Sequence, residues 1–595
     1  MFVGCVAFAT SCDLTENVQV KADKSMIFGS KSGLELYSNS FYKALPTLKN
    51  GFMQDKMCDV GAVSNTDTFI KQGAYNTETA TSWSWGALKN INYFIDGCND
   101  PKYCTVDDNT RDNYLGIARW FRAWFYYDKL TTYGEVPWFP HDIQSYQNDV
   151  MYKDRDSRDV IIRNLIADLD FAYEHIQATS STGSSTLTRW AAAALKSRVC
   201  LFEAAYRRYH NLTGLEITPE ELYREAAKAA KLVIDNSGCS LNTAAGKKGA
   251  YRDLFYSETP LTQEVILAVC ANEKSGIFGE QNWWFNARSY GLCWSLVRSF
   301  VHTYLKQDGT PFTAAADYAV KSFAEEMEGR DLRLEQTVRG RNFLWDGKTA
   351  VADIKNLSLT GYQVIKYTLD ESKYDGGAKN INSIPLIRYA EVLLNYAEAQ
   401  AELGVITDSE WALTVGALRK RAGITGGTET LPTTVDGYLQ RTFYPDVTSP
   451  VLLEIRRERA IELVAEGMRF DDLRRWKCGS LMETLPWSGI HIPGLEQPVD
   501  VNGDGVNDYY FTEGEVASAP AAYKNIAVRV NQDGVGLYAE ANPVSGYDLV
   551  YKTGAGDRYW YPDGRQYLYP IPAKVIRDYR NAGYTISQNP EWDNE

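Results

Sequence analysis

The sequence predicts a mainly α fold, in which a tetratricopeptide-like scaffold of helical hairpins carries a large, irregular, loop-rich part. Two observations predict this class. Long segments with helical periodicity fill the first two-fifths of the chain and return after residue 384. Between them, residues 240–383 are rich in glycine, aromatic and polar residues, with only short strand-like pieces. Paired helices with small residues at close-packing positions are typical of tetratricopeptide-like hairpins.

The N-terminal helices can be placed in order. Residues 83–98, 114–130 and 157–176 each keep an apolar face at helical spacing. The segment RWAAAALKSRVCLFEAAYRRY (residues 189–209) follows, and its alanines allow a neighbouring helix to approach closely. Thr218, Pro219 and Glu221 then form a capping box with proline at the first helical position, which predicts a helix start.

The middle of the chain contains EVILAVCA, QNWWFNARSYGLCW and YQVIKYTL, which we expect to be short strands or loops. Helices return in IPLIRYAEVLLNYAEAQAELG, which ends at Gly404, and in SEWALTVGALRKRAG. The last hundred residues are again rich in glycine and tyrosine and are expected to be mostly irregular.

The charge pattern of residues 453–476, LEIRRERAIELVAEGMRFDDLRRW, allows three interpretations. Glu458, Glu462 and Glu466 form an acidic stripe at four-residue spacing among arginines, and Gly467 can stop the helix. Paired carboxylates could serve acid–base chemistry, or the charges could form a solvated face. We favour a structural network of arginine–carboxylate pairs that joins helices, because planar guanidinium groups suit such partners.

Composition excludes several function classes. The 595-residue chain is 44% hydrophobic and 23% charged, with a net charge of −14 that argues against a nucleic-acid partner. No apolar run after the N-terminus is long enough to span a bilayer. The five histidines are scattered and form no zinc pair, and the chain contains no GxSxG or P-loop motif. We therefore expect no enzyme activity and no catalytic cofactor.

The N-terminal sequence MFVGCVAFATSC resembles a bacterial lipoprotein signal with small residues before a lipidated cysteine, although no basic residue precedes its apolar stretch. We expect residues 1–11 to be the signal and Cys12 to carry the lipid anchor, with Cys5 as the weaker candidate. Cys98 and Cys104 lie in a turn-rich loop, CNDPKYC. Their spacing allows a local disulfide and leaves its formation open.

Seven segments in order resemble the SusD/RagB family of outer-membrane nutrient-binding lipoproteins. These segments, which together span nearly the whole chain, are ARWFRAWFYYDKLTTYGEVPW, DVIIRNLIADLDFAYEHI, AAAALKSRVCLFEAA, IPLIRYAEVLLNYAEAQAELG, ALRKRAGI, the charged block and YLYPIPAKVIRDYRNAGYTISQNPEW. The resemblance implies a lipid-anchored protein on the outer membrane, facing the cell exterior. Its implied partner is a SusC-like TonB-dependent transporter, to which it passes oligosaccharides or polysaccharides without chemistry. It also implies that the charged block is scaffold.

Within this framework, the ligand residues should be exposed aromatic rings with polar neighbours, because sugar rings present flat C–H faces. The segment GEQNWWFNARSYGLCW supplies Trp283, Trp284, Tyr290 and Trp294 as stacking candidates, and Asn282, Asn286 and Arg288 as polar candidates. If this segment is a strand, the adjacent Trp283 and Trp284 cannot both point inward. Trp83 is a further candidate because family ligand contacts fall near the start of its helix, whereas Trp85 is expected in the core.

The segment DVNGDGVND predicts a calcium loop. Asp500, Asn502, Asp504, Gly505 and Asp508 match positions 1, 3, 5, 6 and 9 of an EF-hand-type loop. Position 12 is Phe511 instead of glutamate, so Glu513 would have to substitute, and an Asp/Asn/Gly-rich solvent turn is the alternative. We expect a structural calcium ion that braces the loop.

Taken together, the sequence predicts a noncatalytic glycan-binding protein that delivers its ligand to the transporter. A RagB-like peptide-binding subunit is the alternative, followed by a glycoside hydrolase with two catalytic carboxylates. The predicted regions are the signal (1–11), the lipidated tether (12–35), the N-terminal helices (36–239), the ligand-binding insertion (240–383), the C-terminal helical scaffold (384–477) and the irregular end with the calcium loop (478–595).

Overall fold

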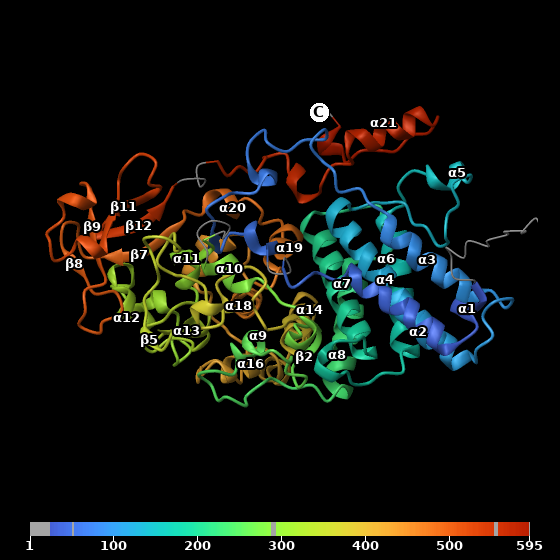
Figure 1. Cartoon of the computed structure of the whole chain (residues 1–595), viewed down its shortest axis with the longest axis horizontal. Helices are drawn as coiled ribbons and strands as arrows, with labels where there is room; N and C mark the ends of the chain where they lie inside the picture. The colour runs from blue at the N-terminus through green and yellow to red at the C-terminus, as the bar shows by residue number, and fades with distance from the viewer. Residues whose placement is uncertain (1–23, 50–52, 287–292, 553–556, 594–595) are drawn as a thin grey trace, which may run out of the picture.

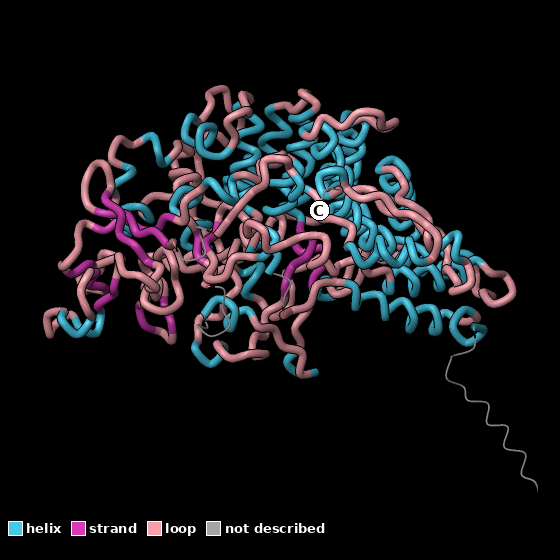
Figure 2. The backbone as a smooth tube through the Cα atoms, turned by 90° about the horizontal axis from the view of Figure 1, so that it is seen from above, coloured by secondary structure: helices cyan, strands magenta, loops and turns pink. Residues whose placement is uncertain are grey.

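The computed structural model describes residues 24–49, 53–286, 293–552 and 557–593 (Figure 1). Its long helices lie at one end of the molecule and most strands at the other (Figure 2). Cys12 and the predicted signal lie outside the described residues. Among the described helices, none is both long and apolar enough to cross a membrane.

The helical end is built from successive helices that pack against one another. Helix α4 packs on α3 and α6, α7 packs on α6 and α8, and α14 packs on α8 and α18. The predicted helical segments are confirmed, and the tetratricopeptide-like superhelix stays a prediction. The helices of this end are α1 (Lys24–Phe28), α2 (Lys31–Asn39), α3 (Gly86–Asn99), α4 (Asp108–Tyr133), α5 (Asn148–Met151), α6 (Arg158–His175), α7 (Arg189–Tyr209), α8 (Pro219–Asn236) and α14 (Tyr389–Glu402).

Local chemistry explains where these helices begin and end. The Asp107 carboxylate accepts a hydrogen bond from the Thr110 N–H at the start of α4, and the helix ends at Gly134 with a positive φ of 76°. The predicted capping box at Thr218 and Glu221 is present, with Pro219 as the first residue of α8.

The loop-rich part contains small sheets and short helices. Its antiparallel strand pairs are β1 (Gly61–Ala62) with β3 (Ser295–Leu296), β2 (Val265–Val269) with β6 (Ile384–Arg388), and β4 (Leu344–Trp345) with β5 (Lys348–Thr349). Its helices are α9 (Asp253–Tyr256), α10 (Gln281–Asn286), α11 (Arg298–Val301), α12 (Phe323–Met327) and α13 (Arg333–Thr337). The predicted strand in EVILAVCA is therefore confirmed as β2, whereas the segment that contains Trp283 is a helix.

The C-terminal third alternates helices with two small sheets. The helices are α15 (Asp408–Leu413), α16 (Val415–Arg421), α17 (Gly437–Phe443), α18 (Pro450–Glu462), α19 (Arg469–Arg475), α20 (Leu481–Thr484) and α21 (Ala573–Asn581). One sheet has the order β10 (Ala527–Arg529), β9 (Tyr509–Thr512), β8 (Pro498–Val499), and the other has the order β11 (Leu537–Ala541), β12 (Tyr547–Tyr551), β7 (Ser488–Ile492). Within the described part of the last hundred residues, these short strands and α21 are separated by long loops, so that stretch is mostly irregular, as expected.

Two large hydrophobic cores hold the molecule together. One joins the N-terminal helices to residues near the C-terminus, such as Ile571 and Trp592. The other lies beneath the loop-rich part and contains Trp294, Tyr367 and Phe511. The chain end therefore returns to the helical end of the molecule, where α21 lies close to α5 (Figure 1).

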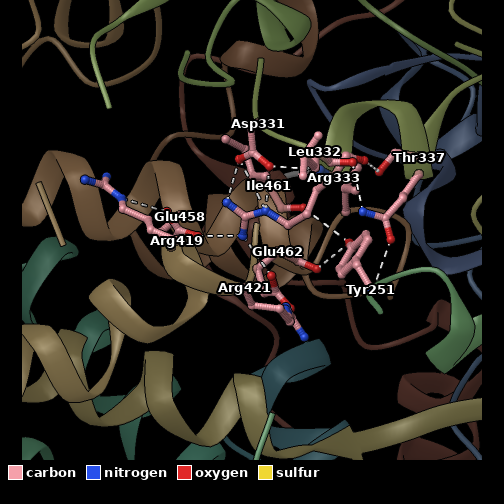
Figure 3. Close-up of polar contacts among 12 residues, drawn as sticks. Tyr251, Asp331, Leu332, Arg333, Thr337, Arg419, Arg421, Glu458, Ile461 and Glu462 are labelled. Atoms are coloured by element: carbon pink, nitrogen blue, oxygen red, sulfur yellow. Dashed lines mark hydrogen bonds and ion pairs between the residues drawn. The ribbon is translucent and has the colours of Figure 1, made fainter. Parts of the chain in front are cut away.

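The charged block forms a buried network, as the structural interpretation predicts. Helix α18 ends at Glu462, and Gly467 lies in the turn before α19 with a φ of 79°. Figure 3 shows Arg333 directed at Asp331, Glu458 and Glu462.

Arg388 adds a further contact, because its Nη1 lies 2.6 Å from a Glu462 oxygen. Burial alone would raise the pKa of this carboxyl, but Arg421, Arg388 and Arg333 hold it well below its usual value.

Cys98 and Cys104 are both free thiols in the structure. The disulfide that their spacing allows is not formed. Cys98 is buried in the helical core, and burial raises the pKa of its thiol.

Candidate functional site

A cavity of about 810 Å³ lies at the helical end, between three segments that are distant in the sequence. These segments are the loop before α3, the loop that carries α5, and α21. The volume falls within the range of about 300–1,000 Å³ that is typical of small-molecule sites. Aromatic side chains from all three segments line it: Trp83, Trp85, Phe139, Tyr152 and Tyr579.

The two tryptophans before α3 pack edge to face, with ring centroids 5.3 Å apart and planes at 71°. Trp83 also contacts Tyr133 at 4.9 Å, and Trp85 contacts Phe139 at 5.2 Å. Both rings are half-buried, so each is fixed on one side and open to the cavity on another. Trp85, expected in the core, is thus also part of the cavity wall.

A second cluster of aromatic side chains is formed by residues of the α5 loop and of the C-terminal segment. Tyr152 stacks on Tyr584 with centroids 5.4 Å apart and meets Tyr579 edge to face at 5.1 Å. The Tyr584 hydroxyl donates to the Asp149 carboxylate in α5. These contacts hold the α5 loop and the chain end together.

Hydrogen bonds to backbone carbonyl groups fix the segments around the cavity. Asn92 of α3, which is buried, donates to the carbonyl oxygens of Phe139 and His141 at 2.8 and 3.1 Å. The Ala573 N–H at the start of α21 donates to the Thr77 carbonyl at 2.9 Å. The wall is therefore preformed.

This arrangement suits a ligand with flat C–H faces and polar edges. The half-buried rings of Trp83, Trp85 and Tyr152 offer apolar surfaces for stacking, while charged side chains lie at exposed positions of the lining. The sequence did not indicate Tyr152 or Tyr579, because no local pattern marks residues that meet only through the tertiary fold.

The predicted tryptophan pair in α10 lies elsewhere. Trp283 and Trp284 are half-buried, with ring centroids 5.6 Å apart, and Trp284 packs against the core of the loop-rich part. Neither residue lines the 810 Å³ cavity. The structure therefore does not bring the two predicted tryptophan groups together at this cavity.

Three further predictions in this segment are corrected by burial. Trp294 is only 4% exposed and packs edge to face on Phe285, so its ring belongs to the core and has no face for stacking. Asn282 is fully buried and exchanges hydrogen bonds with the Leu369 backbone, donating at 2.8 Å and accepting at 2.7 Å. Asn286 is buried as well and accepts from Gln363 at 3.0 Å. These amides hold α10 in place.

Two other candidates, Arg288 and Tyr290, lie outside the described residues.

A second cavity of about 450 Å³ lies where the chain end packs on α6 and α7. Two of its basic residues are engaged within the protein: Arg158 binds Glu203, and Arg155 donates to Asn589 at 2.7 Å. Its smaller volume favours the aromatic cavity as the binding site.

The predicted calcium loop forms a tight turn before β9. Asp500 accepts hydrogen bonds from the backbone N–H groups of Gly503 and Gly505, each at 2.7 Å. Asp508 accepts from the Val501 N–H at 2.8 Å, and Asn502 donates to Asp504 at 3.1 Å. Among the described residues, no three histidine, cysteine or acidic side chains are gathered as a metal site. Calcium binding here stays a prediction.

Comparison with known proteins identifies the family. A model described as the SusD family matches residues 263–592, more than half of the 595-residue chain. A comparison with curated proteins gives no match.

Several solved structures share the fold. A SusD-like carbohydrate binding protein from Bacteroides fragilis NCTC 9343 is 19% identical, with a TM-score of 0.67, and the match covers 93% of this chain and 99% of that chain. A second SusD-like protein from the same strain is 21% identical, with a TM-score of 0.64 and coverage of 96% and 98%. A SusD homolog from Bacteroides thetaiotaomicron VPI-5482 is 16% identical, with a TM-score of 0.59 and the same coverage. Because the family model matches more than half of the chain, and the fold is shared with SusD-like structures, the chain belongs to the SusD family.

Proposed function

We propose that this protein binds oligosaccharides or polysaccharides in the 810 Å³ cavity without catalysing a reaction. The observation that carries the proposal is the meeting of three half-buried rings, Trp83, Trp85 and Tyr152, in one cavity, where the buried Tyr579 packs against Tyr152. Flat aromatic surfaces with polar neighbours are what the C–H faces and hydroxyls of sugars require. A fold relative described as a carbohydrate binding protein supports the same ligand class.

The carboxylates of the cavity favour binding over hydrolysis. Glu78 and Asp578 are exposed, and they pair with Arg577 and Lys574 respectively. A glycosidase needs one carboxylic acid held protonated and a second carboxylate across the scissile bond. Two exposed, ion-paired carboxylates supply neither.

Membership of the family supports a cell-surface role. We propose that Cys12 carries a lipid anchor in the outer membrane, with the protein facing the cell exterior. In this role it would capture glycan and pass it to a SusC-like TonB-dependent transporter for uptake. Co-purification of the transporter from detergent-solubilised membranes through a tag on this chain would test the partnership.

The ligand class is tested by calorimetry and affinity electrophoresis with plant, host and microbial glycans. The proposal predicts saturable binding of at least one glycan and no new reducing ends after prolonged incubation. Cleavage by the pure protein would overturn the noncatalytic assignment. Binding of peptides with no binding of glycans would support the RagB-like alternative instead.

A further inference from the structure

The cations of the aromatic cavity are already paired. Among the described residues that line it, Lys89 lies 3.0 Å from an Asp142 oxygen, and Lys574 lies 2.6 Å from an Asp578 oxygen. Arg577 of α21 pairs with Glu78 in the loop before α3.

The one histidine of this lining, His141, is bound too. Its Nδ1 lies 2.8 Å from an Asp96 oxygen.

Two of these pairs also hold the cavity wall together. The Lys89–Asp142 pair joins α3 to the loop before α5, where Lys89 also donates to the Ile143 carbonyl at 3.0 Å. The Arg577–Glu78 pair joins α21 to the loop before α3. An anionic ligand that recruited either cation would have to compete with a carboxylate and loosen a contact between two segments.

With His141 counted as neutral, the acids on or in contact with this lining, Glu78, Asp578, Asp142 and Asp96, outnumber its cations, Lys89, Lys574 and Arg577, by one. Exposed ion pairs are individually weak, so the balance of charge matters more here than the strength of any one pair. An acidic sugar would lose hydration in this cavity without gaining a free counter-charge. The net charge of −14 over the chain opposes it further.

We infer that the ligand of this cavity is an uncharged oligosaccharide, and that uronic-acid or sulfated glycans are excluded by the paired cations. This inference rests on the proposed function and specifies its substrate class. The aromatic rings supply the contact surface, and the ion pairs supply the selectivity against anions.

Calorimetry at low and high salt measures two affinities for each neutral oligosaccharide that the protein binds. One is the affinity of the neutral form, and the other is that of the same sugar oxidised at C6 to a carboxylate. The neutral form should bind with an affinity that salt hardly changes, and the oxidised form at least about tenfold more weakly. Equal or tighter binding of the oxidised form would overturn the inference and leave glycan binding intact. Failure of every neutral and acidic glycan to bind would overturn the proposed function itself.

Matched variants test the mechanism of selectivity. Glu78→Gln frees Arg577, and Asp142→Asn frees Lys89, so each should strengthen binding of the oxidised form several-fold and make it salt-dependent. Glu216→Gln is the control, because it removes the same charge from an exposed pair with Arg163 that does not line the cavity. Melting curves establish that each variant is folded. If both folded cavity variants prefer the neutral over the oxidised glycan as strongly as the unmodified protein does, the ion pairs do not cause the selectivity.

Discussion

Arg577 and Glu78 form an ion pair across 499 residues of sequence. The contact places the C-terminal helix α21 against the loop that precedes α3, and the aromatic cavity lies between these elements. The binding site proposed here therefore depends on the return of the chain end to the N-terminal helices.

The tyrosine from the α5 loop should contribute to glycan binding. Tyr152→Ala removes an aromatic surface from the cavity and should weaken binding several-fold, since such ring contacts contribute about 0.5–1.5 kcal/mol beyond their buried area. Tyr146→Ala is the matched control, because Tyr146 lies in the same loop, is 80% exposed and does not line the cavity. Calorimetry with a bound glycan gives the comparison, and equal losses in the two variants would argue against this wall of the site.

The buried charge network should be essential for stability. Glu462→Gln leaves Arg333, Arg388 and Arg421 without their shared anion, so we expect a loss of about 3–5 kcal/mol in the free energy of unfolding. Glu216→Gln, in an exposed pair, should cost about 0–1 kcal/mol. Urea unfolding measures both values. Similar stability in the two variants would contradict a structural role for the network.

One half-buried histidine, His210, should make stability depend on pH. Burial lowers the pKa of His210 from 6.5 to about 4, although a hydrogen bond with the Arg474 carbonyl oxygen, 2.8 Å away, acts in the opposite direction. Between these pH values the unfolded chain binds a proton that the folded chain does not bind. The stabilisation that His210 contributes to the free energy of unfolding is therefore fully present above pH 6.5 and is lost as the pH falls towards 4.

Replacement of this residue tests the effect. His210→Gln should show a smaller fall in the free energy of unfolding between pH 7 and pH 4.5 than the unmodified protein, by at most about 3 kcal/mol. Urea unfolding at the two pH values measures it. An identical pH dependence in both proteins would show that His210 titrates equally in the folded and unfolded chains.

The calcium loop gives a separate prediction. If Asp500, Asn502, Asp504 and Asp508 bind the ion, millimolar calcium should raise the melting temperature and chelation should reverse the shift, because a ligand of the folded state stabilises it. Asp500→Asn should abolish the shift. Melting curves that are the same with calcium and with chelator would leave the segment as a solvent turn.

The sequence allowed accurate prediction where local chemistry decides the structure. The start of α8 follows from Thr218, Pro219 and Glu221 alone. The network role of the charged block follows from its spacing, since Glu458 and Glu462 lie on one buried face of α18 and both contact Arg333. Such features can be predicted because they depend on the position of a residue along a helix and on a nearby group of complementary charge or hydrogen-bonding type.

Prediction failed where tertiary packing decides. Trp294 of GEQNWWFNARSYGLCW was predicted to stack on the ligand but lies in the core, whereas Trp283 and Trp284 are half-buried in α10 and their predicted role is untested. At the cavity, the Tyr579 hydroxyl donates a hydrogen bond to the backbone carbonyl of Met151, which lies 428 residues away in the sequence. No local pattern encodes a contact over that distance.

Calorimetry on Trp83→Ala and Trp283→Ala with one bound glycan distinguishes the aromatic cavity from the loop-rich part as the binding site. Trp83 lines the aromatic cavity, whereas Trp283 in α10 does not. We expect Trp83→Ala, if its melting curve shows that it is folded, to weaken binding by about tenfold or more, and Trp283→Ala to bind nearly as tightly as the unmodified protein. Loss of binding in Trp283→Ala with full binding in Trp83→Ala would contradict this expectation and move the site to the loop-rich part.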